Sequence, residues 1–371
     1  MELIIAGDFY LSGRLANVIN PEEIVLAIDP SIRSLIQSAD FSFVNFEGAS
    51  SGETKGILKD GPCLKIPEVG IVGLKSAGFN AITLANNHVG DYSSKGVTDT
   101  IRRCDKNGML HAGAGKDISE AASPLIIGDM EKIAVINICE SEALIATPST
   151  AGTAPIDLIN LFYLIRDLRD RVSFILVIAH GGCEHFPLPT PEMKKRFHFL
   201  IDAGADAVVN HHQHCYCGYE EYNGKPIFYG TGNFLFDNMK SGAPWNYGYM
   251  VKLTTNNEPR FEIIPYHQCE EKPIVELLDS HAFDKELKKL NSIITDDDLL
   301  EREFDRLVRD KKPLSVFLPY SNHYLTELYL RGYLPSFTPK KKLAKMLSRI
   351  KCETHTEILR RKFSPDFSQE Q

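Results

Sequence analysis

The sequence lacks a long hydrophobic run, because no apolar stretch approaches the roughly 20 residues that a membrane-spanning helix requires. Its first residues, MELIIAGDFY, carry no charged leader and no small-residue cleavage site, and they predict a β-strand that begins almost at Met1. We therefore expect a cytoplasmic protein. The sequence also has fewer basic than acidic residues, with 41 Lys and Arg, 49 Asp and Glu and a net charge of -8. A nucleic-acid-binding surface needs a local excess of Lys and Arg, so we expect no nucleic-acid partner.

The sequence also lacks the regular cysteine spacing of a disulfide-bonded protein. Its 8 cysteines are scattered along 371 residues, which predicts reduced thiols and not disulfides. Cys215 and Cys217 form a C-x-C beside several histidines. Zinc sites more often space their cysteines as C-x2-C, so we interpret this pair as buried or partly exposed thiols.

What the sequence does have is an alternation of short β-branched runs with helical patterns over most of its length. Continuous Val/Ile/Leu strands with helices between them predict a largely parallel sheet covered on both faces. The predicted class is α/β with layered helices. Two further strand-like runs, 247–255 and 260–267, are separated by a polar turn and predict an antiparallel hairpin that closes the sheet. From about Val275 onward the strand patterns stop and helical patterns follow.

This change in pattern predicts a domain boundary near residues 271–274. We expect a main domain over 1–270, a helical C-terminal extension over 271–363 and a frayed tail over 364–371. Within the extension, 339–351 predicts an amphipathic helix with Leu343, Met346, Leu347 and Ile350 on one face and basic residues on the other. Such a helix either lies peripherally on an anionic membrane surface, at the inner face, or packs on the body of the protein with a solvated basic face.

Polar side chains gather where the predicted strands end. In a parallel sheet this edge collects ligands. Each residue alone has a structural explanation, because an Asp can cap a helix, an Asn can form a turn and a lone His can be a hydrogen-bonded core residue. Agreement at five strand ends favours a binding site. The residues are Asp8; Glu47; Asn86, Asn87 and His88; His180 and Glu184; and His211, His212 and His214.

The chemistry of these side chains predicts a metal site. Carboxylates, an amide oxygen and imidazoles are the ligands that divalent Mn, Fe, Zn or Mg prefer. If His212 and His214 lie in an extended segment, both side chains point to one face and serve two metals. Gly181 and Gly182 allow a sharp turn and leave room for ions or substrate near the main chain.

The order of these motifs resembles the calcineurin-like metallophosphoesterases, and more closely the CapA-type capsule-synthesis (poly-γ-glutamate synthesis) proteins that share their fold. The matching segments occur in family order and cover roughly residues 1 to 265, with LANNH and GNFLFD, and the H-x-H between them, as the most specific. The resemblance implies a metallophosphatase layered sandwich with helices on its faces. The segments are Gly7–Arg14, Asn45–Gly48, Leu84–Gly96, His111–Gly115, Ala179–His185, Asp202–His214 and Gly224–Asp237.

The same resemblance implies a centre of two divalent metals. It makes His88 a general acid, paired through Asn86 or Asp91, and it places Glu47 between or beside the metals. An anionic substrate is expected near Arg14, the Asn233 loop and His211. The implied metal ligands are Asp8, Asn87, His180, His212 and His214.

The sequence departs from the phosphoesterase pattern in one important place, because Tyr10 stands where a ligand His is usual. One metal is then expected to lack a ligand, to be bound weakly or to recruit Glu184. Two further departures are Asn210, where Gly is more frequent, and Gln213, where Pro is frequent. We interpret both as tolerable.

Three functions remain open at this point. The first is a metal-dependent hydrolase or transferase that acts on a phosphoester, or on an amide-linked or sugar polymer, during capsule or surface-polymer synthesis. The second is a non-catalytic assembly factor for a membrane-bound polymer synthase or exporter. The third is a polymer-binding module that uses the aromatic segment Trp245–Met250, for which a strand with half-buried aromatics is the alternative account.

Overall fold

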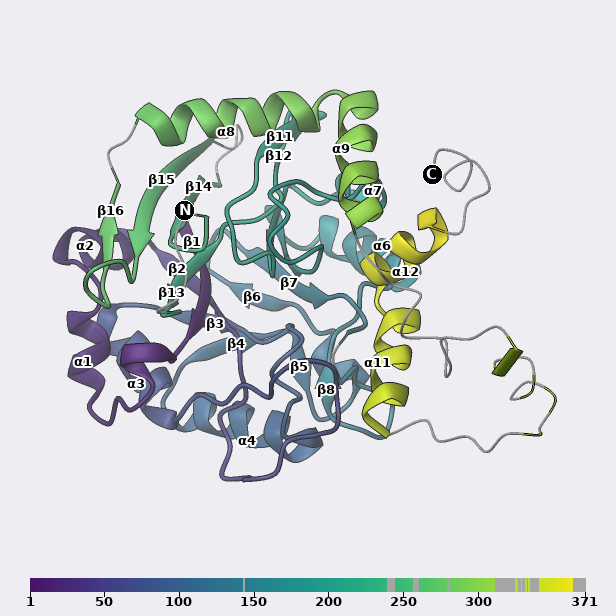
Figure 1. Cartoon of the computed structure of the whole chain (residues 1–371). Coiled ribbons are helices and arrows are strands. Elements are labelled where there is room, and N and C mark those ends of the chain that lie inside the picture. The colour runs from purple at the N-terminus through teal and green to yellow at the C-terminus, as the bar shows by residue number, and fades with distance from the viewer. Residues whose placement is uncertain are drawn as a thin grey trace.

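Two β-sheets lie face to face, with helices on their outer sides (Figure 1). The layer between the sheets is apolar and takes Leu3 and Ile5 from one sheet and Leu176 and Val209 from the other, all fully buried. The predicted layered α/β sandwich is thus confirmed. The computed structural model describes residues 1–142, 144–238, 244–255, 260–278, 281–310, 324–325, 328, 331, 333 and 340–362.

The first sheet combines a parallel half with an antiparallel half. Its order is β16-β15-β14-β1-β2-β3-β4, and β13 pairs with β1 beyond the end of β14. The predicted hairpin is confirmed as β14 and β15, whereas the prediction that strands stop near Val275 is wrong, because β16 extends the hairpin. The bounds are β1 Glu2–Tyr10, β2 Phe41–Phe46, β3 Ala81–Thr83, β4 Leu110–Ala112, β13 Asn233–Phe236, β14 Tyr247–Thr254, β15 Arg260–Gln268 and β16 Val275–Leu277.

The second sheet has the order β11-β12-β10-β9-β7-β6, and its four central strands run parallel. These strands are the continuous apolar runs of the sequence, buried on both faces as parallel strands require. A two-stranded ribbon, β5 Ala114–Gly115 and β8 Gly152–Thr153, stands apart. The sheet bounds are β6 Leu125–Ile127, β7 Ile133–Cys139, β9 Phe174–His180, β10 Ala207–His211, β11 Tyr219–Tyr222 and β12 Lys225–Phe228.

Helices cover both outer faces, and their ends carry clear sequence signals. Helix α7, for example, starts with the Thr190 side chain accepting from the Met193 backbone N–H, has Pro191 in its first turn, and ends at Gly204 with φ 124°. Helices α1 to α4 pack on the first sheet and α6 and α7 on the second. The bounds are α1 Pro21–Leu26, α2 Pro30–Ser38, α3 Glu68–Ala77, α4 Ser93–Lys106, α5 Ile118–Ala121, α6 Leu158–Arg169 and α7 Pro191–Ala203.

The described stretches 281–310 and 340–362 of the C-terminal segment are helical, as predicted, and pack on the second sheet's side of the molecule (Figure 1). In α12, Glu357 accepts hydrogen bonds from the Thr190 hydroxyl and the Glu192 backbone N–H of α7, and Arg361 pairs with Asp305 of α9 at 2.7 Å. The domain boundary itself stays a prediction, and residues 363–371, with the predicted tail, lie outside the described residues. The bounds are α8 His281–Ile294, α9 Asp297–Asp310, α11 Lys340–Lys351 and α12 Glu353–Lys362.

The predicted amphipathic helix is confirmed as α11, but most of its apolar face is not packed on the body. Leu343, Leu347 and Ile350 are 52%, 51% and 60% exposed. Among the described helices, none is long and apolar enough to cross a membrane. None of the eight cysteines, all of which lie in the described part of the chain, forms a disulfide, and Cys215 and Cys217 are both buried, in agreement with the interpretation from the sequence.

Candidate metal centre

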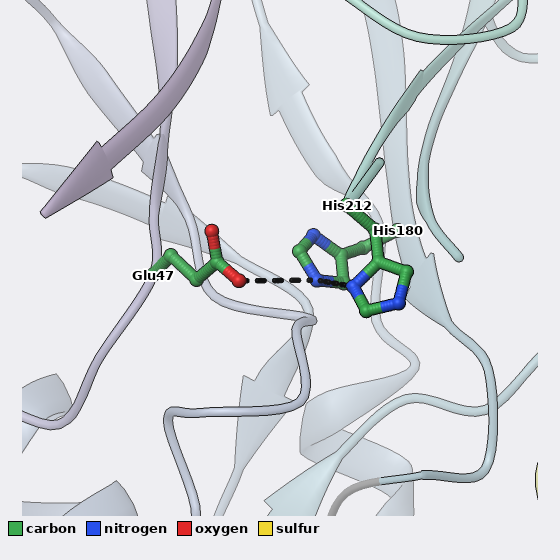
Figure 2. Close-up of side chains that lie close together, drawn as sticks. All are labelled: Glu47, His180 and His212. Carbon is green, nitrogen blue, oxygen red and sulfur yellow. Dashed lines mark hydrogen bonds and ion pairs between the residues drawn. The ribbon is translucent and has the colours of Figure 1, made fainter. Parts of the chain in front are cut away.

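The carboxyl ends of strands from both sheets meet at one place. Glu47 directly follows β2, and His180 is the last residue of β9, so the two arrive from opposite sheets (Figure 2). His212 follows β10, and Asn87 lies in the turn after β3. The sequence predicted that side chains after these strands lie close together, and the structure places them together.

Five buried residues form two overlapping groups of metal-ligating atoms. The first contains Glu47, His180 and His212, and the second contains Asp8, Glu47 and His214; in each, one ligand atom per residue lies within 4.8 Å of the others. The Asn87 side-chain oxygen lies 3.0 Å from His180 Nε2 and so adjoins the first group. Glu47 belongs to both groups, as expected for a carboxylate between two sites.

The surroundings of the Glu47 carboxylate test whether these groups fit a cation. The residue is fully buried, and neither of its carboxylate oxygens has a hydrogen-bond partner. Two imidazole nitrogens lie just beyond hydrogen-bond distance of Glu47 Oε1, with His214 Nε2 at 3.7 Å and His180 Nε2 at 3.8 Å. A buried carboxylate without partners is costly unless it coordinates a metal or takes up a proton. The residues present thus fit a divalent ion.

A β-bulge aims Asp8 at the same point. The register of β1 shifts between Asp8 and Phe9 against β13, and between Ala6 and Asp8 against β2. Gly7 makes this possible, because a Cβ there would lie 2.0 Å from the Gly232 carbonyl oxygen. Asn45 of β2 donates from Nδ2 to Asp8 Oδ1 at 2.7 Å and fixes the carboxylate.

His212 and His214 converge through a strained turn and not through an extended strand. Their φ angles are 100° and 56°, in the left-handed region that side chains other than Gly rarely occupy. The expectation that an extended H-x-H puts both imidazoles on one face is therefore wrong, and the two histidines serve different groups. Asn233 Oδ1 accepts from His214 Nδ1 at 2.9 Å, which leaves Nε2 free to face Glu47.

Burial and neighbouring charges shift the pKa values of Glu47 and His180 in opposite directions. Burial, with the charges of Asp8 and Glu184, raises the pKa of Glu47 well above its ordinary value. Burial, with the neighbouring imidazoles of His212 and His211, lowers the pKa of His180 well below its ordinary value. Without a cation, the carboxyl is protonated more readily and the imidazole is neutral, which is the form that binds metal.

His88 and Asp91 form a buried dyad at the edge of the groups. His88 Nδ1 lies 2.6 Å from Asp91 Oδ2, and His88 Nε2 points toward Glu47 at 3.9 Å. Burial lowers the pKa of His88, and the hydrogen bond that His88 donates to Asp91 opposes that shift. Asn86 does not contact the imidazole; its Oδ1 accepts from the backbone N–H groups of His88 and Val89 and shapes the turn. Of the two partners the sequence left open, the structure pairs His88 with Asp91.

Several other predicted residues have different surroundings. Glu184 is exposed and belongs to neither ligand group. Arg14 pairs with Asp237 at 2.9 Å and donates to the carbonyl oxygens of 269–271, contacts that favour a structural role. His211 Nδ1 lies 2.9 Å from the Thr231 hydroxyl, its Nε2 has no partner, and burial lowers its pKa to about 3.

The two glycines after β9 have a different use from the one predicted. Gly182 does provide a sharp turn, at φ 108°. A Cβ at Gly181 would lie 2.5 Å from Glu140 Cγ, and one at Gly182 would lie 2.9 Å from Gln213 Nε2. The space beside these glycines is therefore filled by Glu140 and Gln213, not kept for ions or substrate.

Tyr10 cannot replace the missing ligand. Burial raises the pKa of its phenol above the ordinary value, and its ring packs edge-on against Phe236 with centroids 5.0 Å apart. A protonated phenol is a poor metal ligand. The Asp8 group therefore has three protein donors. Trp245, from the predicted aromatic segment, packs on His214 with ring centroids 4.9 Å apart, just before β14 begins.

Three residues near the centre were missed by the sequence reasoning. Glu142 follows β7, with Oε2 3.4 Å from Asn87 Nδ2 and 3.8 Å from His212 Nε2. Lys59 donates to Asp91 Oδ1 at 2.7 Å and to the Asn87 carbonyl at 2.8 Å. Asn45 bonds Asp8, as described above. A lone amide inside the apolar run FSFVNF was a usable signal for Asn45, and the end of the strand 133–139 was one for Glu142.

Comparison with known families decides the classification. Residues 2–238 match the family described as "Bacterial capsule synthesis protein PGA_cap". The chain belongs to this family. The matched segment contains both ligand groups and the His88–Asp91 dyad, and α8 to α12 lie beyond it.

Individual proteins are similar in sequence to this PGA_cap family member at a moderate level. "PGA biosynthesis protein CapA" of Bacillus subtilis (strain 168) is 25% identical over 72% of this chain and 72% of that protein. "Capsule biosynthesis protein CapA" of Bacillus anthracis is 27% identical over 61% of this chain, and the match spans only 57% of that protein. A probable polyglutamine synthesis accessory protein of Mycobacterium tuberculosis (strain CDC 1551 / Oshkosh) is 26% identical over 54% of this chain and 56% of that protein.

Proposed function

We propose that this PGA_cap family member is a divalent-metal-dependent hydrolase or transferase in the synthesis of a capsule or surface polymer. The observation that carries the proposal is the pair of buried ligand groups that share Glu47, a carboxylate with no hydrogen-bond partner. The relatives named for capsule and poly-glutamate synthesis support the choice of pathway. Poly-γ-glutamate, a polysaccharide or a phosphoester is the proposed substrate.

The proposed centre holds two ions, of Mn, Fe, Zn or Mg. Glu47, His180, His212 and the Asn87 oxygen hold one, and Asp8, Glu47 and His214 hold the other. When bound, such ions polarise a phosphoryl or carbonyl oxygen and provide a nucleophile from water. The second group has fewer donors, because Tyr10 remains protonated.

His88 is the proposed general acid. Asp91 accepts from Nδ1 at 2.6 Å, so the imidazole is held with Nε2 toward the metal-ligating groups. Burial lowers the pKa of His88, which makes its proton easier to transfer to a leaving group. Lys59 holds the other oxygen of Asp91 at 2.7 Å and keeps that carboxylate in place.

A second candidate function is an accessory factor that assists a membrane-bound synthase or exporter without turnover. The three-donor Asp8 group beside Tyr10 favours it, as does the word "accessory" in the name of the mycobacterial relative. This candidate predicts that polymer-synthesis proteins are recovered when the chain is pulled down from cells. Recovery of the chain alone would count against it.

The metal content of the purified protein tests the main proposal. Elemental mass spectrometry should find two divalent ions per chain in the parent and fewer in His212→Ala, whereas His267→Ala, on β15 and outside both groups, should match the parent. Background levels in the parent, even after incubation with manganese, would refute the metal proposal and leave the accessory role.

A further inference from the structure

Four donor atoms lie close together in the first ligand group. His180 Nε2 lies 3.0 Å from Asn87 Oδ1 and 3.1 Å from His212 Nδ1. Glu47 Oε1 lies 3.8 Å from the same nitrogen (Figure 2). An ion in this group would therefore contact His212 through Nδ1 and Asn87 through Oδ1. This choice of atoms is not automatic, because an imidazole has two nitrogens and an amide can turn its nitrogen inward.

The other polar side-chain atoms of Asn87 and His212 face a single carboxylate, that of Glu142. Asn87 Nδ2 donates to Glu142 Oε2 at 3.4 Å, and His212 Nε2 lies 3.8 Å from the same oxygen. Glu142 belongs to neither ligand group, and its side chain is 19% exposed. One largely buried carboxylate oxygen thus lies behind two of the four donors.

A carboxylate in this place determines which atoms Asn87 and His212 present to an ion. An ionised carboxylate only accepts hydrogen bonds, so it favours the Asn87 orientation with Nδ2 outward and Oδ1 inward. It also favours the His212 tautomer with the proton on Nε2, which leaves the lone pair of Nδ1 for the ion. His214 is held in the opposite sense, because Asn233 Oδ1 accepts from its Nδ1 and leaves Nε2 inward.

Glu142 is in turn held by the first turn of α12. Glu353 accepts from both the backbone N–H and the hydroxyl of Ser141, at 2.7 Å and 2.9 Å. One residue earlier, Glu140 accepts from the Thr354 hydroxyl at 2.7 Å. The two residues before Glu142 are therefore both bonded to α12, which lies beyond the segment that matches the PGA_cap family.

We infer that Glu142 is a positioning residue, which fixes His212 Nδ1 and Asn87 Oδ1 as the atoms that bind the first ion, and that α12 holds it in place through Ser141. The inference rests on the proposed function for the presence of that ion. It makes the C-terminal helices a determinant of metal affinity, although none of their described residues belongs to either ligand group.

Long-range proton–nitrogen NMR of the metal-free protein, isotopically labelled at histidine, tests the tautomer at mildly alkaline pH, where imidazoles are neutral. The parent should carry the His212 proton on Nε2, and the signals are identified by their loss in His212→Gln. Glu142→Ala should move the proton to Nδ1 in a measurable fraction of molecules. Glu142→Gln keeps an oxygen that accepts from Nε2, so it should retain the parental tautomer.

Manganese titration calorimetry of the full-length protein tests the effect on the first ion. Loss of a residue that orients a metal ligand typically weakens metal binding about 10–100-fold, so Glu142→Ala should raise the dissociation constant of one ion by about that factor. Glu142→Gln should raise it less, and Glu353→Ala should lie between the parent and Glu142→Ala. Glu221→Ala removes an exposed carboxylate on β11 and should bind as the parent does.

The inference is overturned if the parent carries the His212 proton on Nδ1, or if Glu142→Ala matches the parent in both tautomer and manganese affinity. Equal losses of affinity in Glu142→Ala and Glu142→Gln would also overturn it, because charge and not orientation would then act. Parental affinity in Glu353→Ala would reject the role of α12. Far-UV circular dichroism shows whether each variant is folded.

The two readouts separate this inference from the proposed function. A parent that binds no manganese would reject the metal centre, whereas a His212 tautomer that depends on Glu142 in the metal-free protein would still support the positioning role. Two bound ions with no dependence on Glu142 in either readout would do the reverse.

Discussion

Asn210 Nδ2 lies 3.0 Å from Gln213 Oε1, so the two positions at which the chain departs from the common Gly and Pro hydrogen-bond each other. Both amides also donate toward the Tyr229 carbonyl, at 2.9 Å and 2.7 Å. The pair encloses the turn that carries His212. The interpretation that these departures are tolerable has a physical basis, because Asn210 supplies the donor for Gln213 Oε1 and the Tyr229 carbonyl accepts from both amides.

This pairing predicts coupled effects on stability. Asn210→Ala should lower the free energy of unfolding by about 1–3 kcal/mol, because it leaves the buried Gln213 Oε1 without its donor. Gln213→Ala should cost less, because Asn210 Nδ2 keeps other carbonyl oxygens as acceptors. The double variant should lose less than the sum of the two, by about 0.5–3 kcal/mol. Urea unfolding of the metal-free proteins measures all three. Losses that simply add would show that the two amides act independently.

Metal removal should destabilise the parent protein. At free metal about 100 times the dissociation constant, binding to the folded state alone adds about 2.7 kcal/mol. EDTA should therefore lower the thermal midpoint by several degrees. Glu47→Gln removes the carboxylate shared by both ligand groups, so its midpoint should not respond to EDTA. An equal response in parent and variant would place the metal elsewhere.

Metal affinity should increase with pH. The folded-state pKa of Glu47 is raised, so its protonated form adds stability to the metal-free protein at low pH, and this contribution is lost as pH rises through that pKa. Metal binding requires the carboxylate and so releases the proton. His180 has a lowered pKa and is already neutral, so it should release little.

Calorimetry in two buffers of different ionisation enthalpy measures the released protons. The apparent binding enthalpy for manganese should differ between the buffers while the pH lies below the raised pKa of Glu47, and the difference should diminish as pH rises through that pKa. Binding enthalpies that agree in both buffers at every pH would mean that Glu47 is already ionised before metal arrives.

The His88–Asp91 dyad should affect turnover without affecting metal content. His88→Asn removes a general acid and should lower kcat by about 10²–10⁴-fold on a hydrolysed phosphoester with an alkyl leaving group, which needs a proton to depart. Asp91→Asn should lower it less, because the imidazole remains but loses its orientation. Elemental analysis should find parental metal in both variants. A variant that loses metal would make the dyad part of the ligand set.

The sequence predicted that the polar residues at strand ends lie close together, because the geometry of a parallel sheet determines where those ends meet. Parallel strands deliver their carboxyl ends to one edge, and alternating apolar runs locate those ends, so Asp8, Glu47, His180 and the His212–His214 pair could be grouped. The same rule applied to the strand 133–139 would have found Glu142.

Other features depend on contacts that no local pattern records. Lys59 comes from the irregular stretch 50–64, where no periodicity fixes the direction of a side chain. The backbone angles of His212 and His214 are set by the surrounding packing, so an extended H-x-H was the natural but wrong expectation. Arg14 matched a family motif and was predicted to bind substrate, yet its guanidinium forms a salt bridge with Asp237, which is far away in the sequence.

The attachment of the C-terminal helices to the segment after β7 has a consequence for synthesis of the chain. Ser141 and Glu353 are 212 residues apart. At about 5–20 residues per second, the ribosome needs roughly 10–40 s between making the first partner and the second. All the metal-ligating residues have left the ribosome long before α12 exists. A growing chain therefore contains the residues of both ligand groups first, and the contacts of α12 with the segment after β7 are among the last to form.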